Sequence, residues 1–230
     1  MDAQPFHHIV IDNFLDSDVA TEIEAELRNL PESEWHDKST GFSHINNQPD
    51  CATQSKKVAL NIRSQIPPLT NKVIDFFSSS QLMRFIEAIT EIPDLQEDPF
   101  LLGGGVHKTI TNGHLSVHAD FNIHPQTGKH RRINALLYLN SHWKPGYNGE
   151  LELWNKDMSS VAHRIEPIKN RLVIFRITDE ALHGSPNPWL APLDYPRLSL
   201  AFYYYTDDRP DHEKKDFHWA VWHKRSADAY

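Results

Sequence analysis

The sequence predicts a mainly β fold of the α+β kind, in which about seven or eight short strands form a double-stranded β-helix, or jelly roll, behind supporting N-terminal helices. Up to about Phe100, apolar residues recur at helical spacing. Beyond it, short apolar or alternating runs are separated by Gly, Pro and Asn. The 230 residues contain no internal repeat and no Gly- or Ser-rich linker, so we expect one domain spanning residues 1–230.

Residues 1–100 are expected to supply the helical support. A short strand in PFHHIVIDNFL precedes VATEIEAELRNL, whose apolar residues recur every three or four positions. Asp16 or Ser17 caps the start of this helix, and Pro31 stops it. Two further periodic stretches cover the ranges 69–77 and 81–92.

Two segments are candidates for walls or lids of a site. Between Glu32 and Asn61 the chain is polar and rich in Ser, Asn, His and Asp, which predicts a long surface loop. The tail from 207 to 230 is the second candidate, because it follows the last predicted strand. The sequence does not indicate what either segment does.

The jelly-roll core is expected to span residues 101–206. Its predicted strands are the runs LLGGGVHKTI, HLSVHAD, INALLYLN, ELELW, AHRIEPI, RLVIFRI and RLSLAFYYYT. Asn148 and Gly149 stand directly before ELELW, and both residues tolerate a positive φ, which is typical of a tight hairpin turn.

The charge and the amino terminus exclude several classes of protein. A formal charge of −8 disfavours a nucleic-acid partner, although the basic strip at 129–132 leaves an anionic substrate open. The single cysteine, Cys51, cannot form an internal disulfide, so no oxidising compartment is needed. The start MDAQPFHHIV lacks the features of a signal peptide, and no run is long enough for a membrane helix. We expect a cytoplasmic protein without a membrane partner; its oligomeric state is left open.

The pattern His118-Ala119-Asp120, followed 65 positions later by His183, is the sharpest chemical feature. Residues two apart in a strand face the same way, so His118 and Asp120 can bind one metal ion together. Two His and one carboxylate on one face of an octahedron leave three positions open, as in iron(II) enzymes that bind a co-substrate and O₂. A surface or core histidine is the alternative interpretation of this motif taken alone.

A second motif, Arg197-Leu198-Ser199, begins 14 residues after His183. Arg197 and Ser199 share a strand face, so a guanidinium and a hydroxyl can converge on one carboxylate. Arg supplies the two-pronged hydrogen bond that Lys cannot, which suits a dicarboxylate cofactor. An arginine at a strand start is otherwise more often a solvated surface charge.

Together these stretches resemble the catalytic core of the Fe(II)/2-oxoglutarate dioxygenases, specifically the prolyl 4-hydroxylase-like branch. The resemblance covers about Leu101 to Thr206 and is carried by GHLSVHADFNIH, RRINALLYLNSHW, NGELELW, RLVIFRITDEALHG and PRLSLAFYYYT. It implies that His118, Asp120 and His183 bind iron, as metal ligands and catalytic residues. The gap from His183 to Arg197 is longer than is usual in relatives, because it contains NPWLAPLDYP.

The resemblance also suggests further site residues. Arg197 would pair with the distal carboxylate of 2-oxoglutarate, and Tyr138 matches a tyrosine that hydrogen-bonds the same group. Arg131 stands where relatives can carry an arginine near the substrate, although a solvated arginine in a basic turn is the alternative. Trp189 lies in the insert beside the expected site and is a candidate substrate contact.

The implied activity is hydroxylation of an unactivated C–H bond with release of succinate and CO₂. The cofactors would be Fe(II), 2-oxoglutarate and O₂, with ascorbate as the reductant. The substrate would be a prolyl residue, a free amino acid or another small metabolite. Asp120 disfavours halogen transfer, because relatives that transfer chlorine have a small residue there. A cupin-type metalloprotein that does not use 2-oxoglutarate and a catalytically idle binding module are the alternatives.

Overall fold

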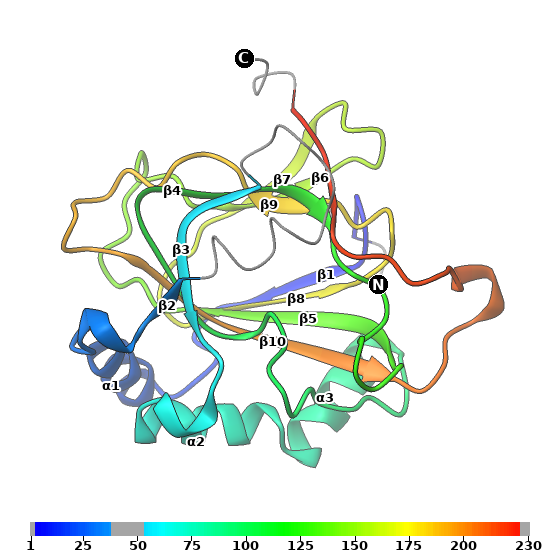
Figure 1. Ribbon diagram of the computed structural model, residues 1–230, viewed down its shortest axis with the longest axis horizontal. Coiled ribbons are helices and arrows are strands. Elements are labelled where there is room, and N and C mark those ends of the chain that lie inside the picture. Colours follow the sequence, from blue (N-terminus) through cyan, green and yellow to red (C-terminus); the bar gives the residue numbers. More distant parts are fainter. Residues whose placement is uncertain (1–2, 38–52, 226–230) are drawn as a thin grey trace.

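The computed structural model describes residues 3–37 and 53–225 and shows two β layers with helices on one side (Figure 1). Its helices are α1 (Ser17–Arg28), α2 (Pro68–Phe77) and α3 (Ser80–Thr90), with 3-10 turns at Glu32–Glu34, Arg63–Gln65 and Asp211–Glu213. The strands among the described residues are β1 (His8–Ile11), β2 (His36–Asp37), β3 (Gln54–Leu60), β4 (Gly105–Ala119), β5 (His130–Tyr138), β6 (Leu151–Trp154), β7 (Val161–Ile165), β8 (Arg171–Arg176), β9 (His183–Ser185), β10 (Arg197–Thr206) and β11 (Val221–Trp222).

The strands form one antiparallel sheet that curls into a half-barrel. Its order is β1-β8-β5-β10-β4-β9-β6-β7, with β3 and β11 also paired to β4. The strands β1, β8, β5 and β10 make the lower layer in Figure 1, and β9, β6 and β7 belong to the upper one. This arrangement is the jelly-roll fold that the sequence predicts.

The helices cover the outer face of the lower layer (Figure 1). The start of α1 is capped by Asp16, whose carboxylate accepts hydrogen bonds from two backbone N–H groups of the first turn. Phe77 of α2 stacks on Phe202 of β10, with ring centroids 3.9 Å apart. The three helices begin and end within two residues of the predicted positions, because local capping and periodicity specify them. None of the described helices is long and apolar enough to cross a membrane.

The long strand β4 connects the two layers. Its first half pairs with β10, from Gly105 opposite Ala201 to Thr109 opposite Arg197. Its second half pairs with β9, where His118 lies opposite His183. The sequence predicted two separate runs here; they are one strand whose backbone bends near Asn112, at a φ of 66°. The change of layer within β4 is what brings the two motifs of the sequence together.

Two expectations about connecting segments are wrong. The predicted loop between Glu32 and Asn61 contains β2 and the seven-residue strand β3, which pairs with β4 about 50 residues further along the chain. That pairing stabilises a polar strand. The composition of residues 32–61 does not predict it, because the partner strand is distant in the sequence. Residues 38–52 of the predicted loop, including Cys51, lie outside the described residues.

The expected hairpin before β6 is also absent. Asn148 and Gly149 do adopt positive φ, at 58° and 78°. They nevertheless connect strands that are not neighbours, because β5 pairs with β8 and β10 whereas β6 pairs with β7 and β9.

Candidate active site

A cavity of about 140 Å³ lies between the two layers and contains both sequence motifs. His118 comes from the end of β4, His183 from β9, and Arg197 from the start of β10. Asp120 follows β4 directly, so the bend in that strand delivers the carboxylate and His118 to the same wall. The cavity therefore unites the two sequence motifs, whose outermost residues His118 and Arg197 are 79 positions apart in the chain.

The potential metal ligands His118, Asp120 and His183 converge at one end of this cavity. One ligand atom from each lies within 4.8 Å of the others, and all three residues are buried. The Nε2 of His118 lies 3.5 Å from Oδ1 of Asp120, and the Nε2 of His183 lies 3.4 Å from Oδ2. Two ligand atoms about 2.1 Å from one ion and at right angles would be about 3 Å apart, so an octahedral ion fits with small shifts.

Both imidazoles present the nitrogen that a metal requires. Nδ1 of His118 lies 2.9 Å from the carbonyl oxygen of Ser116, and Nδ1 of His183 lies 2.8 Å from that of Ala181. A carbonyl can only accept, so each Nδ1 must carry the proton and donate it. The lone pair of each Nε2 is then directed into the cavity, which is the tautomer that binds metal.

The charges at this end match the needs of a divalent cation. Burial raises the pKa of Asp120, but Arg131, His183 and His118 together outweigh it and hold that pKa far below its usual range. Burial lowers the pKa of His183 to about 4. At neutral pH, Asp120 is therefore an anion and His183 a neutral imidazole.

The other end of the cavity can receive a carboxylate. Ser199 lies opposite Tyr138 in the pairing of β10 with β5, and both line the cavity with Arg197. Nε of Arg197 donates to the carbonyl oxygen of Gly149 at 2.8 Å, and Nη2 donates to Ser185 Oγ at 3.3 Å. These bonds fix the orientation of the guanidinium, whose central carbon lies 4.9 Å from the centroid of the Tyr138 ring.

The Tyr138 hydroxyl is the clearest sign of a missing partner. It is fully buried and has no hydrogen-bond partner in the described part of the chain. Burial raises the pKa of this phenol despite the nearby Arg197, so the group is a neutral donor. An unpaired buried hydroxyl costs free energy unless a ligand accepts its proton, so Tyr138 fits a bound carboxylate.

Gly149 allows Trp189 to close this end of the cavity. A Cβ on Gly149 would lie 2.5 Å from the Trp189 ring and 3.0 Å from the Arg197 side chain. Only glycine permits this close approach, and it also adopts the positive φ of 78° at low cost. Trp189 is fully buried, so it forms a wall beside Arg197.

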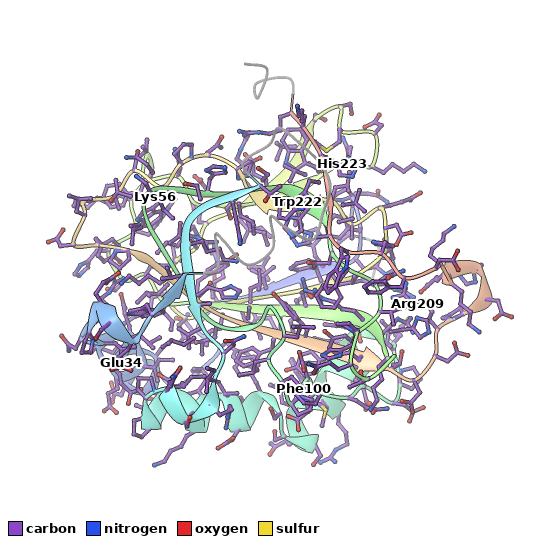
Figure 2. The ribbon with its side chains drawn as sticks, in the orientation of Figure 1. Glu34, Lys56, Phe100, Arg209, Trp222 and His223 are labelled. Carbon is purple, nitrogen blue, oxygen red and sulfur yellow. The ribbon has the colours of Figure 1, made fainter. Side chains whose placement is uncertain are left out.

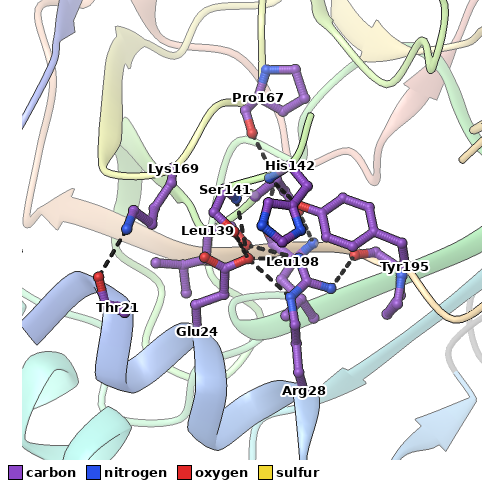
Figure 3. Close-up of polar contacts among 12 residues, drawn as sticks. Thr21, Glu24, Arg28, Leu139, Ser141, His142, Pro167, Lys169, Tyr195 and Leu198 are labelled. Carbon is purple, nitrogen blue, oxygen red and sulfur yellow. Dashed lines mark hydrogen bonds and ion pairs between the residues drawn. The ribbon is translucent and has the colours of Figure 1, made fainter. Parts of the chain in front are cut away.

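A polar network from α1 holds that wall in place (Figure 3). Glu24 accepts hydrogen bonds from Arg28 Nε at 2.9 Å and from the Ser141 backbone N–H at 3.1 Å. The Arg28 guanidinium lies 4.0 Å above the ring of Tyr195. The carbonyl of Tyr195 in turn accepts a hydrogen bond from Trp189 Nε1 at 2.9 Å. These contacts connect the insert NPWLAPLDYP to helix α1.

The C-terminal segment supplies a wall near the potential metal ligands. β11, which carries the Trp222 side chain labelled in Figure 2, pairs with the end of β4. The Trp222 ring lies 4.7 Å from the ring of His118. Trp222 and Ala220 both line the cavity. Part of the predicted tail therefore lies at the cavity, and its wider role as a wall or lid stays a prediction.

The predicted basic strip at 129–132 is not a continuous surface feature. Arg131 and Arg132 are buried, 1% and 4% exposed, and are paired with acidic groups. Arg131 lines the cavity, but its guanidinium lies 3.1 Å from Asp120 Oδ2. A direct contact of Arg131 or Trp189 with substrate stays a prediction.

Sequence reasoning missed three residues that build the site: Asn134, Ser185 and Trp222. Asn134 could have been found, because it precedes Tyr138 by four positions on one strand and therefore shares its face. Ser185 and Trp222 lie on strands of three and two residues, which are too short to leave a periodic signal.

The chain has a jelly-roll fold, and its three converging donors match the facial arrangement of two His and one carboxylate found in non-haem iron oxygenases. Residues 104–205 match the sequence profile described as the 2OG-Fe(II) oxygenase superfamily. No curated protein sequence matches the chain.

Solved structures with the same fold include prolyl hydroxylases and HygX. A prolyl-4-hydroxylase from Pseudomonas putida is 19% identical, with a TM-score of 0.56, over 87% of this chain and 93% of that one. A Trichoplax adhaerens prolyl hydroxylase, solved with a hypoxia inducible factor peptide, is 17% identical with a TM-score of 0.59, over 87% of this chain and 84% of that one. HygX from Streptomyces hygroscopicus, with nickel, 2-oxoglutarate and hygromycin B bound, is 13% identical with a TM-score of 0.58, over 95% and 93%.

Residues 104–205 are therefore similar to the 2OG-Fe(II) oxygenase superfamily, and the chain shares the fold of solved prolyl hydroxylases.

Proposed function

We propose that this protein hydroxylates an unactivated C–H bond, with His118, Asp120 and His183 holding Fe(II) and with Arg197, Tyr138 and Ser199 holding the distal carboxylate of 2-oxoglutarate. One observation carries the assignment. The convergent donors and the unpartnered Tyr138 hydroxyl line a single cavity. A metal and a dicarboxylate of matching length would complete it.

The bound iron and 2-oxoglutarate would supply the oxidising chemistry, with succinate and CO₂ as the products of the co-substrate. The chain's own residues bind and orient. Arg197 would donate two parallel hydrogen bonds to the carboxylate, and Tyr138 would donate its hydroxyl proton to the same group. Trp189 and Trp222 would exclude water from the two ends of the cavity.

The substrate is proposed to be a prolyl residue, a free amino acid or another small metabolite. One structural neighbour was solved with a peptide and another with hygromycin B, so this fold can bind both peptides and small molecules. A cupin-type protein without 2-oxoglutarate is disfavoured by the family match, and so is an idle binding module.

Release of succinate from 2-oxoglutarate by the purified protein, with Fe(II) and ascorbate and without added substrate, tests the proposed function. We expect slow succinate formation that stops when a chelator removes the iron. A panel of prolyl peptides, amino acids and small metabolites should then contain a compound that accelerates it. Equal succinate formation with and without iron would contradict the proposal.

Replacing Tyr138 with Phe should weaken 2-oxoglutarate binding without harming the fold. One lost hydrogen bond to a charged group corresponds to about 1.5–3 kcal/mol, or roughly 10- to 150-fold in the KM for 2-oxoglutarate. Because the hydroxyl is unpaired in the free protein, the free energy of unfolding should not fall. Thermal melts of the metal-free Tyr138→Phe and wild-type proteins supply that control, and a KM equal to that of the wild type would remove Tyr138 from the site.

Trp222 should report metal binding by fluorescence. A paramagnetic ion such as Co(II), bound to Nε2 of His118, would lie close to the Trp222 ring and quench its emission. Among the six tryptophans, Trp222→Phe should remove the largest share of Co(II)-dependent quenching. Trp143→Phe is the matched control, since Trp143 does not line the cavity. Undiminished quenching in Trp222→Phe would place the ion elsewhere.

A further inference from the structure

Two buried side chains contact the same oxygen of the Asp120 carboxylate. Asn134 Nδ2 donates to Oδ2 at 2.8 Å, and Arg131 Nη2 forms an ion pair with that oxygen at 3.1 Å. Oδ1 lies 3.5 Å from Nε2 of His118, and Oδ2 also lies 3.4 Å from Nε2 of His183. Because both side-chain contacts are made to Oδ2, Oδ1 keeps more of its lone-pair capacity for a metal ion.

Arg131 and Asn134 also fix one another. Nε and Nη2 of Arg131 donate to Oδ1 of Asn134 at 3.0 and 2.8 Å. The amide therefore has a single possible orientation, because its oxygen must face the guanidinium and its NH₂ group must face the carboxylate. Both side chains are at most 2% exposed, so water does not compete for these bonds.

Two aromatic rings pack against the Arg131 guanidinium. It lies 3.5 Å from the centroid of the Tyr203 ring and 4.5 Å from that of the Phe121 ring. Stacking of this kind suits the planar guanidinium and would not hold a lysine ammonium in one orientation. Arg131 is thus positioned before any ligand arrives, and its contacts are directed to Asp120 and Asn134.

We infer that Asn134 and Arg131 are positioning residues that keep Asp120 a one-oxygen ligand. A carboxylate that turned both oxygens to the metal would occupy a second coordination position. Three open positions are needed when a co-substrate that chelates through two atoms and O₂ share the ion. By engaging the lone pairs of Oδ2, Asn134 and Arg131 would keep that oxygen from the metal and preserve the third open position. This inference rests on the proposed metal site.

The test compares Asn134→Ala with wild type in two measurements that need no turnover. The first is the affinity of the metal-free protein for Co(II). The second is the anaerobic affinity of the Fe(II)-loaded protein for 2-oxoglutarate, followed by the visible charge-transfer absorption. We expect Co(II) still to bind to Asn134→Ala and the affinity for 2-oxoglutarate to fall about 10- to 100-fold, the size of the loss in metal affinity or activity when a group that orients a metal ligand is removed.

Two further variants separate positioning from a merely structural role. Asn71→Ala removes two hydrogen bonds of a partly buried asparagine on α2, away from the cavity, and should lower the melting temperature without changing either affinity. Arg131→Lys keeps the charge but cannot bridge Asp120 and Asn134, so it should weaken 2-oxoglutarate binding, and Arg131→Met should weaken it further.

The outcomes distinguish this inference from the proposed function. If wild-type protein takes up neither Co(II) nor Fe(II), the metal site itself is wrong. If the wild type binds metal and 2-oxoglutarate and folded Asn134→Ala binds both with the same affinities, the positioning role is overturned while the proposed function stands.

Discussion

Replacing a proposed metal ligand should abolish the activity of this protein. Both His183→Ala and Asp120→Ala are expected to lower the rate of succinate formation by about 1,000-fold or more, because the metal stabilises the transition state by several kcal/mol. Loss of Fe(II) uptake, measured by metal analysis after gel filtration, should accompany the loss of activity. His212→Ala is the matched control, because this ring is 81% exposed and outside the cavity.

The two variants should differ in stability. Asp120→Ala leaves the buried Arg131 without its carboxylate, and an unpaired buried charge costs about 3–5 kcal/mol. His183→Ala removes a neutral ring and should keep more of the stability of the metal-free protein. Chemical denaturation of both metal-free variants measures this difference. Full iron uptake by a folded His183→Ala protein would remove this residue from the ligand set.

The second large effect concerns the arginine at the far end of the cavity. Arg197→Ala should raise the KM for 2-oxoglutarate by roughly 30-fold to several thousand-fold, because removing one partner of a buried charge pair costs about 2–5 kcal/mol. Iron uptake should persist, since Arg197 does not contact His118, Asp120 or His183. Arg197→Lys should lie between wild type and Arg197→Ala, because a lysine ammonium cannot form the two-pronged bond.

Initial rates at a series of 2-oxoglutarate concentrations supply the measurement. Arg63→Ala breaks an ion pair with Asp75 that is exposed and outside the cavity, and it serves as the control. An unchanged KM in Arg197→Ala would show that another group anchors the co-substrate. Loss of iron uptake in that variant would instead indicate a general collapse of the site.

Much of the site could be predicted because its residues carry short-range signals. His118 and Asp120 stand two apart at the end of a strand, and Arg197 and Ser199 repeat that spacing at the start of another. The strand period of two therefore places each pair on one face before any tertiary structure is known. The helices were predictable for a similar reason, since capping and periodicity are local.

The remaining features depend on pairings between distant segments. β3 pairs with β4, which follows about 50 residues later in the chain. β11, close to the C-terminus, places Trp222 opposite His118 in the middle of the chain. Arg131 is the clearest case. The register of β5 against β10 shifts between Tyr204 and Tyr205, and a bulge of this kind changes the face on which the next residues lie. The alternation of β5 alone could not predict that Arg131 faces Asp120.

Anaerobic titration of the metal-free protein with 2-oxoglutarate, before and after one equivalent of Fe(II), tests the central claim most directly. A visible absorption band should appear only when metal and co-substrate are both present, and it should saturate at one 2-oxoglutarate per chain. Absence of the band, or equally tight binding of 2-oxoglutarate without metal, would contradict the assignment of this cavity.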